Sequence, residues 1–123
     1  MNQSDKTVKI QELKDLMAQF VKERDWEKFH SPKNLSMSIA IEAAELMEHF
    51  QWADEETALK TLKDKESDIK DELADIALFL FEFASLYKID LSDAIVNKLN
   101  KNKKKYPTDL VKGKSDKYTA YAS

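Results

Sequence analysis

Two pairs of acidic residues, each set in an apolar, helix-forming segment, constrain this chain most strongly. The pairs are Glu42/Glu45 and Glu72/Asp75, and both have i, i+3 spacing. That spacing puts the two acids of a pair on one face of a helix. Because the flanking residues are apolar and an unpaired buried charge is costly, the acids need a partner. We therefore expect two antiparallel helices that bring both pairs to one level.

Composition and periodicity predict an all-α fold, a bundle of four to five helices. The sequence has 1 Gly and 2 Pro in 123 residues, and most of its residues favour helix. The apolar period and the capping signals predict long helices over about 6–25, 34–52, 67–87 and 90–105, with a short one over 54–62. Asn34 and Asp90 are the expected N-caps of the second and last long helices. We expect one domain over 1–123, with an extended basic tail over about 107–123.

Four clustered carboxylates favour a hard divalent cation. Mg²⁺ takes oxygen ligands and leaves room for substrate phosphates, so we predict a Mg²⁺ site, with Mn²⁺ as the expected substitute. The predicted ligands are Glu42, Glu45, Glu72 and Asp75. A di-iron site would need Glu-x-x-His on two helices, whereas His49 lies four residues after Glu45 and segment 67–87 has no His. The alternative is that the acids lie on solvent-facing stripes of a non-catalytic helical interaction module.

Basic and aromatic residues supply candidates for substrate contacts. Lys98, Asn102 and Lys105 share one helical stripe and could hold phosphate oxygens, or they could be ordinary surface residues. Trp26 and Trp52 lie in or beside expected connectors. Such aromatic residues either fill the core or stack on a nucleobase. His30 could contact the base or sugar, or could cap a helix.

Charge and composition exclude several classes of protein. The chain has no Cys and 2 His, which argues against disulfides and against a His-based zinc site. No apolar run approaches the roughly 20 residues of a membrane span, and the N-terminus does not resemble a signal peptide. We therefore expect a cytoplasmic protein without membrane contact. Residues 1–96 hold 12 basic and 21 acidic residues, against 8 and 2 in 97–123; the acidic body argues against nucleic-acid binding.

The order of these features resembles the MazG-type all-α nucleoside triphosphate pyrophosphohydrolases. Their ExxE–spacer–ExxD motif matches the two acid pairs residue for residue. Within that superfamily the chain is most similar to the dCTP pyrophosphatase branch, and the resemblance covers roughly residues 12–118. The matching strings are Glu23-Arg24-Asp25-Trp26-Glu27, Phe29-His30, Asn34-Leu35, Phe50-Gln51-Trp52, Lys98 through Asn102 to Tyr106-Pro107, and Ser115-x-Lys117-Tyr118.

This resemblance implies Mg²⁺-dependent hydrolysis of a deoxynucleoside triphosphate to the monophosphate and pyrophosphate, as house-cleaning of the nucleotide pool. It implies that the four acids bind metal, that Glu42 or Glu45 also activates water, and that Trp26 and Trp52 hold the base, with His30 as a further candidate for a base contact. Lys98, Asn102 and Lys105 would contact phosphates, partly across subunits of a homodimer or homotetramer.

The chain departs from the dCTP branch at positions that concern recognition. Met17 replaces a His and Phe79 replaces a Tyr, while lysines replace arginines at Lys33 and within Lys103–Lys105. An apolar pocket discriminates less strongly than one that forms hydrogen bonds, and lysine lacks the bidentate geometry of arginine. We therefore expect dCTP or a related nucleotide as substrate, with dUTP and phosphoribosyl-ATP as alternatives on the same scaffold.

Overall fold

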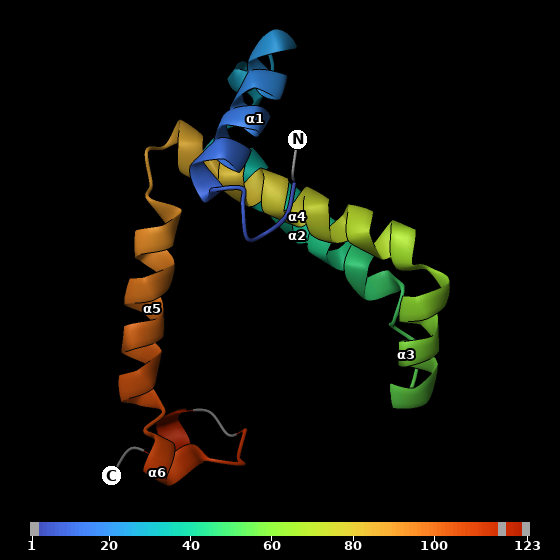
Figure 1. Cartoon of the computed structure of the whole chain (residues 1–123), viewed down its shortest axis with the longest axis vertical. Coiled ribbons are helices and arrows are strands. Elements are labelled where there is room, and N and C mark those ends of the chain that lie inside the picture. Colours follow the sequence, from blue (N-terminus) through green and yellow to red (C-terminus); the bar gives the residue numbers. More distant parts are fainter. Residues whose placement is uncertain (1–2, 116–117, 122–123) are drawn as a thin grey trace. The chain divides into compact units, whose positions relative to one another are not determined.

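A computed structural model describes residues 3–115 and 118–121, and within these ranges it contains helices and turns but no strand. The all-α prediction is therefore confirmed. The elements, drawn in Figure 1, are α1 Ile10–Glu23, the 3₁₀ turn η1 Glu27–Phe29, α2 Pro32–Glu48, α3 Glu55–Asp64, α4 Glu66–Leu86, α5 Leu91–Lys105, α6 Thr108–Val111 and the 3₁₀ turn η2 Tyr118–Tyr121. They fall into two compact units, and the boundary between the units in the sequence lies between Ile89 and Asp90. The single domain stays a prediction.

The first unit is organised around α4. Helices α2 and α4 run antiparallel and side by side, α1 also packs on α4, and α3 touches it more briefly (Figure 1). The most deeply buried apolar residues come from the three long helices and are Met17, Val21, Leu35, Ile69 and Ala84. Because α4 contacts each of the other helices of this unit, residues from α1, α2 and α4 can line one site.

The start of α2 differs from the prediction. Asn34 is not its N-cap: Ser31 is, and its hydroxyl accepts a hydrogen bond from the Asn34 N–H at 3.1 Å. Pro32 follows in the first turn, where a missing N–H costs nothing, so the helix begins earlier than expected. The Asn34 side chain instead donates to the carbonyl oxygen of Phe29 at 2.9 Å. That bond ties the start of α2 to η1.

The remaining helix starts follow their sequence signals. Asp54 and Thr57 form a reciprocal capping box at α3, and the predicted cap Asp90 accepts a hydrogen bond from the Asp93 N–H at 2.9 Å. The extended tail was wrong in part, because α6 and η2 are helical turns. Lys117, part of the matching tail string, lies outside the described residues.

Membrane insertion finds no support in the helices. None of those in the described part of the chain combines the length and the apolar character that a bilayer crossing requires.

Replacing Leu35 by Ala should lower the free energy of unfolding by about 2–5 kcal/mol, because it leaves a cavity in a packed core. Leu35 is fully buried, whereas Leu59 on α3 is 70% exposed. Urea denaturation of Leu35→Ala and of the control Leu59→Ala would test this. Equal losses in the two variants would contradict the assigned core.

Candidate metal centre and adjoining cavity

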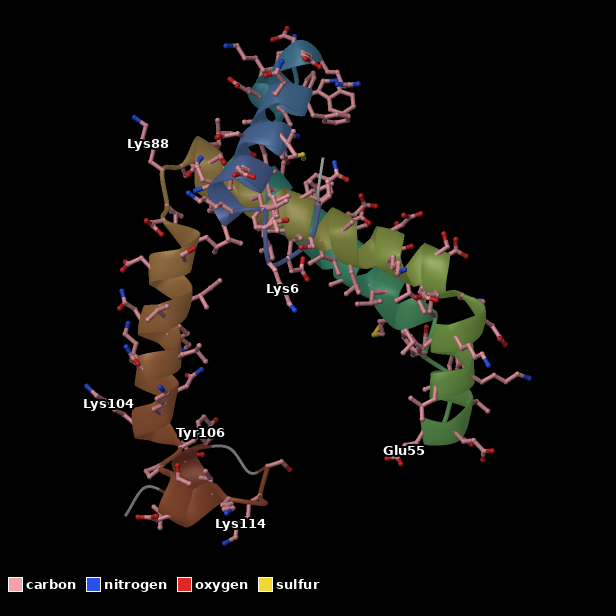
Figure 2. The ribbon with its side chains drawn as sticks, in the orientation of Figure 1. Lys6, Glu55, Lys88, Lys104, Tyr106 and Lys114 are labelled. Carbon is pink, nitrogen blue, oxygen red and sulfur yellow. The ribbon has the colours of Figure 1, made fainter. Side chains whose placement is uncertain are left out.

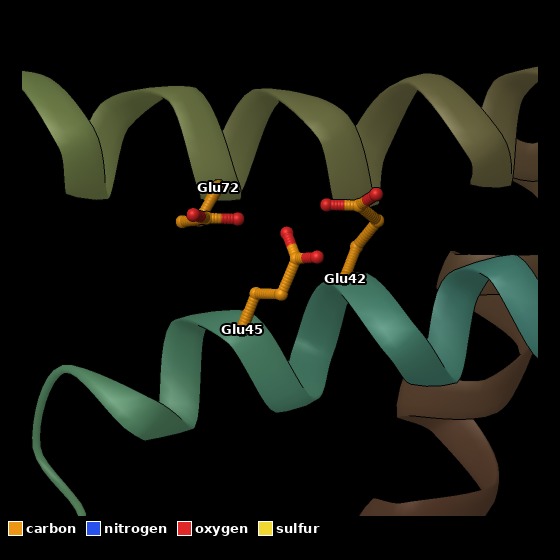
Figure 3. Close-up of side chains that lie close together, drawn as sticks. All are labelled: Glu42, Glu45 and Glu72. Atoms are coloured by element: carbon orange, nitrogen blue, oxygen red, sulfur yellow. The ribbon is translucent and has the colours of Figure 1, made fainter.

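Three of the four predicted acids meet where α2 packs against α4. Glu42 and Glu45 project from α2 toward Glu72 on α4, and one carboxylate oxygen of each lies within 4.8 Å of the other two (Figure 3). Oε2 of Glu42 and Oε2 of Glu72 are both buried and have no hydrogen-bond partner. Such oxygens are costly to leave unpaired. Glu72 is at least 27 residues away from the two acids of α2 in the sequence. The three acids meet because α2 and α4 are antiparallel.

The acids perturb one another electrostatically. Burial, then contact with Glu45 and the charges of Glu45, Asp75 and Glu72, raise the pKa of Glu42 to about 7. Burial and Glu45 also raise the pKa of Glu72, and His49 opposes that rise. His49 Nε2 lies 3.7 Å from Glu72 Oε1. Without a counter-cation, therefore, the cluster resists full ionisation at neutral pH.

The donor set fits a hard divalent cation. Carboxylate oxygens are the ligands that Mg²⁺ prefers, and acidic clusters on protein surfaces are common without a metal. Here, however, two of the oxygens are buried and unpartnered. A cation would supply the partner that these oxygens lack.

Asp75, the fourth predicted ligand, lies between the acid cluster and a cavity. It is not among the three acids whose oxygens approach within 4.8 Å. Its charge nevertheless raises the pKa of Glu42, and its side chain lines the cavity. Asp75 therefore connects the two halves of the candidate site.

The cavity has a volume of about 550 Å³ and is bounded by α1, η1, α2 and α4. Its apolar walls include Leu16, Met17, Phe20, Trp26, Phe29 and Phe79. Its polar lining residues are His30, Asn34, Ser38 and Asp75. Met17 and Phe79, two of the positions at which the sequence departs from the dCTP branch, both line this cavity.

The aromatic wall is held in place by its own contacts. The rings of Phe20 and Trp26 meet edge to face, with centroids 5.8 Å apart. The Arg24 guanidinium lies 3.8 Å from the centre of the Phe20 ring and donates to the Phe20 carbonyl oxygen. Asp25, which lies between Arg24 and Trp26 in the sequence, takes a left-handed backbone conformation with φ 55°. This conformation turns the chain from α1 into η1. Trp26 thus presents an ordered ring to the cavity.

His30 occupies the polar side of the same cavity and has a partner that sequence reasoning missed. Its Nδ1 lies 3.9 Å from Oε1 of Glu82 on α4. The Tyr87 hydroxyl donates to the His30 carbonyl oxygen at 2.7 Å. His30 ends η1 as its C-cap residue and also lines the cavity, so its role in contacting a base stays a prediction. The sequence signal for this partner was Glu82 itself, an acidic residue within the otherwise apolar segment 76–84.

The other predicted contacts are not part of this cavity. Trp52 is 90% exposed and does not line it. Lys98, Asn102 and Lys105 belong to α5 in the second unit. Figure 2 shows many basic side chains on that unit, among them Lys104 and Lys114. The roles of these residues in substrate binding stay predictions.

Comparison with known proteins identifies the family. The sequence profile of the MazG-like family matches residues 37–120. The chain belongs to the MazG-like family. It is 38% identical over 112 residues to dCTP pyrophosphatase 1 from Bos taurus and 36% identical to that from Homo sapiens, which covers 89% of this chain and 66% of each relative. The chain thus spans slightly less than two thirds of those relatives.

A solved structure supports the same assignment. A pyrophosphatase from Archaeoglobus fulgidus is 33% identical to this MazG-like chain and superimposes with a TM-score of 0.77. The match covers 87% of this chain and 97% of the archaeal one. The resemblance therefore extends through most of both folds.

The raised pKa of Glu42 predicts a pH dependence of stability in metal-free protein. The folded protein keeps a proton on Glu42 over a range, from 4.5 to about 7, in which the unfolded chain has lost it. The Glu42 contribution to the free energy of unfolding therefore falls as pH rises through that range. Urea denaturation in EDTA should show a smaller fall for Glu42→Gln than for the wild type. The exposed control Glu48→Gln should keep the wild-type slope; identical profiles for wild type and Glu42→Gln would refute the assignment.

Proposed function

We propose that this protein is a Mg²⁺-dependent nucleoside triphosphate pyrophosphohydrolase that converts a deoxynucleoside triphosphate, dCTP or a related nucleotide by preference, to the monophosphate and pyrophosphate. One observation carries the proposal: a cluster of carboxylates with unpartnered buried oxygens adjoins an aromatic cavity, and Asp75 belongs to both surroundings. The role would be to remove surplus or non-standard nucleotides from the cytoplasmic pool.

The two halves of the site suit the two halves of a nucleotide. Trp26 can stack on a base, and His30 can form a hydrogen bond to its edge, because both line the cavity. With the base there, the triphosphate would extend past Asp75 toward Glu42 and Glu72. Acids alone would repel phosphates, so a cation between them is required. The named activities of the relatives, dCTP pyrophosphatase and pyrophosphatase, support this reading.

The chemistry is attack of water on the α-phosphorus. A bond forms from the water oxygen to that phosphorus, the bond to the bridging oxygen of the β-phosphate breaks, and pyrophosphate leaves. Glu42 or Glu45 would orient the water and take its proton. Bound Mg²⁺ would neutralise the polyphosphate and stabilise the charge on the leaving group. Glu72 and Asp75 would complete the ligand set and keep the acids in register.

The proposal also includes phosphate contacts from residues of α5, within a homodimer or homotetramer. Lys98, Asn102 and Lys105 would contact phosphate oxygens. Some of these residues, together with Trp52, would contribute to the site of a neighbouring subunit. Support comes from large apolar side chains that are more than 40% exposed on the first unit, among them Met37, Ile41, Leu73 and Leu80. Extended exposed apolar surface commonly marks an interface.

The same scaffold could accept dUTP or phosphoribosyl-ATP in place of dCTP, and a nucleotide panel separates these cases. We expect Mg²⁺-dependent pyrophosphate release from dCTP, dTTP, dUTP, dATP, dGTP and 5-methyl-dCTP to be greatest for the cytosine nucleotides and to vanish in EDTA. Similar release from all bases would keep the reaction and remove the specificity. Release from none of them, with none from phosphoribosyl-ATP, would favour a non-catalytic interaction module.

Replacing Glu45 by Gln should reduce turnover by at least about 100-fold, because it removes a charge from the metal site, while the fold persists. Mg²⁺ should raise the thermal midpoint of the wild type, since a ligand that binds only the folded state stabilises it, and that rise should shrink in Glu45→Gln. Glu48→Gln, three residues further along α2, is the matched control. Near wild-type turnover of Glu45→Gln at saturating Mg²⁺ would contradict the metal assignment.

A further inference from the structure

Glu82 and His30 form a buried polar pair beside the cavity, away from the acid cluster. The Glu82 side chain is 2% exposed and that of His30 is 13% exposed. Oε2 of Glu82 and Nδ1 of His30 are both buried without a hydrogen-bond partner, and Nδ1 lies 3.9 Å from Oε1 of Glu82. Burying such a pair costs free energy of folding, so its presence beside the cavity calls for a functional explanation.

The backbone around His30 fixes which way its ring faces. The Tyr87 hydroxyl holds the His30 carbonyl oxygen, and the His30 N–H donates to the Glu27 carbonyl oxygen at 3.0 Å. The Asn34 side chain holds the neighbouring Phe29 carbonyl oxygen. Because Nδ1 faces Glu82 and His30 lines the cavity, Nε2 is the ring nitrogen left to meet a bound molecule.

Charge balance and hydrogen-bond pairing together indicate which ring nitrogen carries the proton. An imidazolium beside a carboxylate is neutral overall, and so is a neutral imidazole whose Nδ1 accepts the proton of a carboxylic acid. In both states Nε2 carries a proton. A neutral imidazole protonated on Nδ1 would leave one of two unfavourable states where the Glu82 side chain is 2% exposed. One is an uncompensated carboxylate, and the other is a carboxylic acid whose buried Oε2 has no hydrogen-bond partner. Burial and the charge of Glu27 also raise the pKa of Glu82, while His30 opposes the rise.

We propose that Glu82 is a positioning residue that keeps a proton on Nε2 of His30, so that His30 donates a hydrogen bond to an acceptor atom on the edge of the bound base. This inference rests on the proposed function for its ligand. The acceptor would be a ring carbonyl oxygen or an unprotonated ring nitrogen, and cytosine offers both in O2 and N3. Because Met17 and Phe79 are apolar, a donor from His30 would supply discrimination that those walls cannot.

The protonation state can be measured without any activity. The chain has 2 His, so long-range ¹H–¹⁵N spectra of the full chain contain two imidazoles, and His30→Gln assigns them. At pH 7.5 without nucleotide, we expect a proton on His30 Nε2. A bare Nε2 with a proton on Nδ1, the state common where a carboxylate faces Nδ1, would overturn the proposal.

The kinetic test uses two substitutions of similar size. Glu82→Leu removes the partner of Nδ1 and should lower kcat/KM for dCTP about tenfold, mainly through KM, the value of one hydrogen bond. Glu82→Gln can still donate to Nδ1 and should recover most of that loss. The matched surface control is Glu66→Leu, because the Glu66 side chain is 64% exposed on the same helix. It should match the wild type.

A double substitution separates positioning from packing. His30→Gln places an amide near the position of Nε2 and no longer depends on Glu82, so adding Glu82→Leu to it should cost less than about twofold more. A Glu82→Gln variant as impaired as Glu82→Leu, or fully additive losses, would overturn the proposal. A wild-type protein that releases no pyrophosphate from any nucleotide would instead end the proposed function, and the imidazole spectra would still decide the protonation state.

Discussion

Repulsion among carboxylates at the seam between α2 and α4 is the constraint on which the rest of the structure depends. Packing of the two helices holds Glu42, Glu45 and Glu72 within 4.8 Å of one another, although like charges at that distance oppose it. The apolar residues around the seam must therefore supply the stabilisation, since the acids do not. A cation that entered the cluster would reverse the sign of its contribution, so that metal binding and folding would support each other.

The surroundings of the α4 side chains change along the helix, from the acid cluster through the cavity to the buried pair of Glu82 and His30. At Glu72 the surroundings are acidic and suit a cation. At Phe79 they are apolar and suit the face of a base. At Glu82 the side chain is 2% exposed, so that its interaction with His30 is little screened by solvent. A nucleotide has the same progression from charged phosphates to an apolar ring with a polar edge.

The features that could be predicted from the sequence were those set by local periodicity. Spacing alone identified the acid pairs, and the long helices and the cap at Asp90 followed from pattern and propensity. The errors arose where neighbouring residues competed: Ser31 displaced Asn34 as cap because Pro32 is tolerated in a first turn. The partnership of Glu82 with His30 depends on how η1 folds back onto α4, across 52 residues of sequence. No local rule links two such positions.

The spacing of the site residues along α4 has a consequence for how such a protein can change. Glu72, Asp75, Phe79 and Glu82 follow one another at intervals of three, four and three residues, which keeps them within a narrow arc of the helix. Single substitutions could change the acid cluster, the cavity wall and the buried polar pair one at a time. A single-residue insertion in the middle of α4 would rotate everything beyond it by about 100° and disconnect all three at once. Diversification of this helix should therefore proceed by replacement and leave its length unaltered.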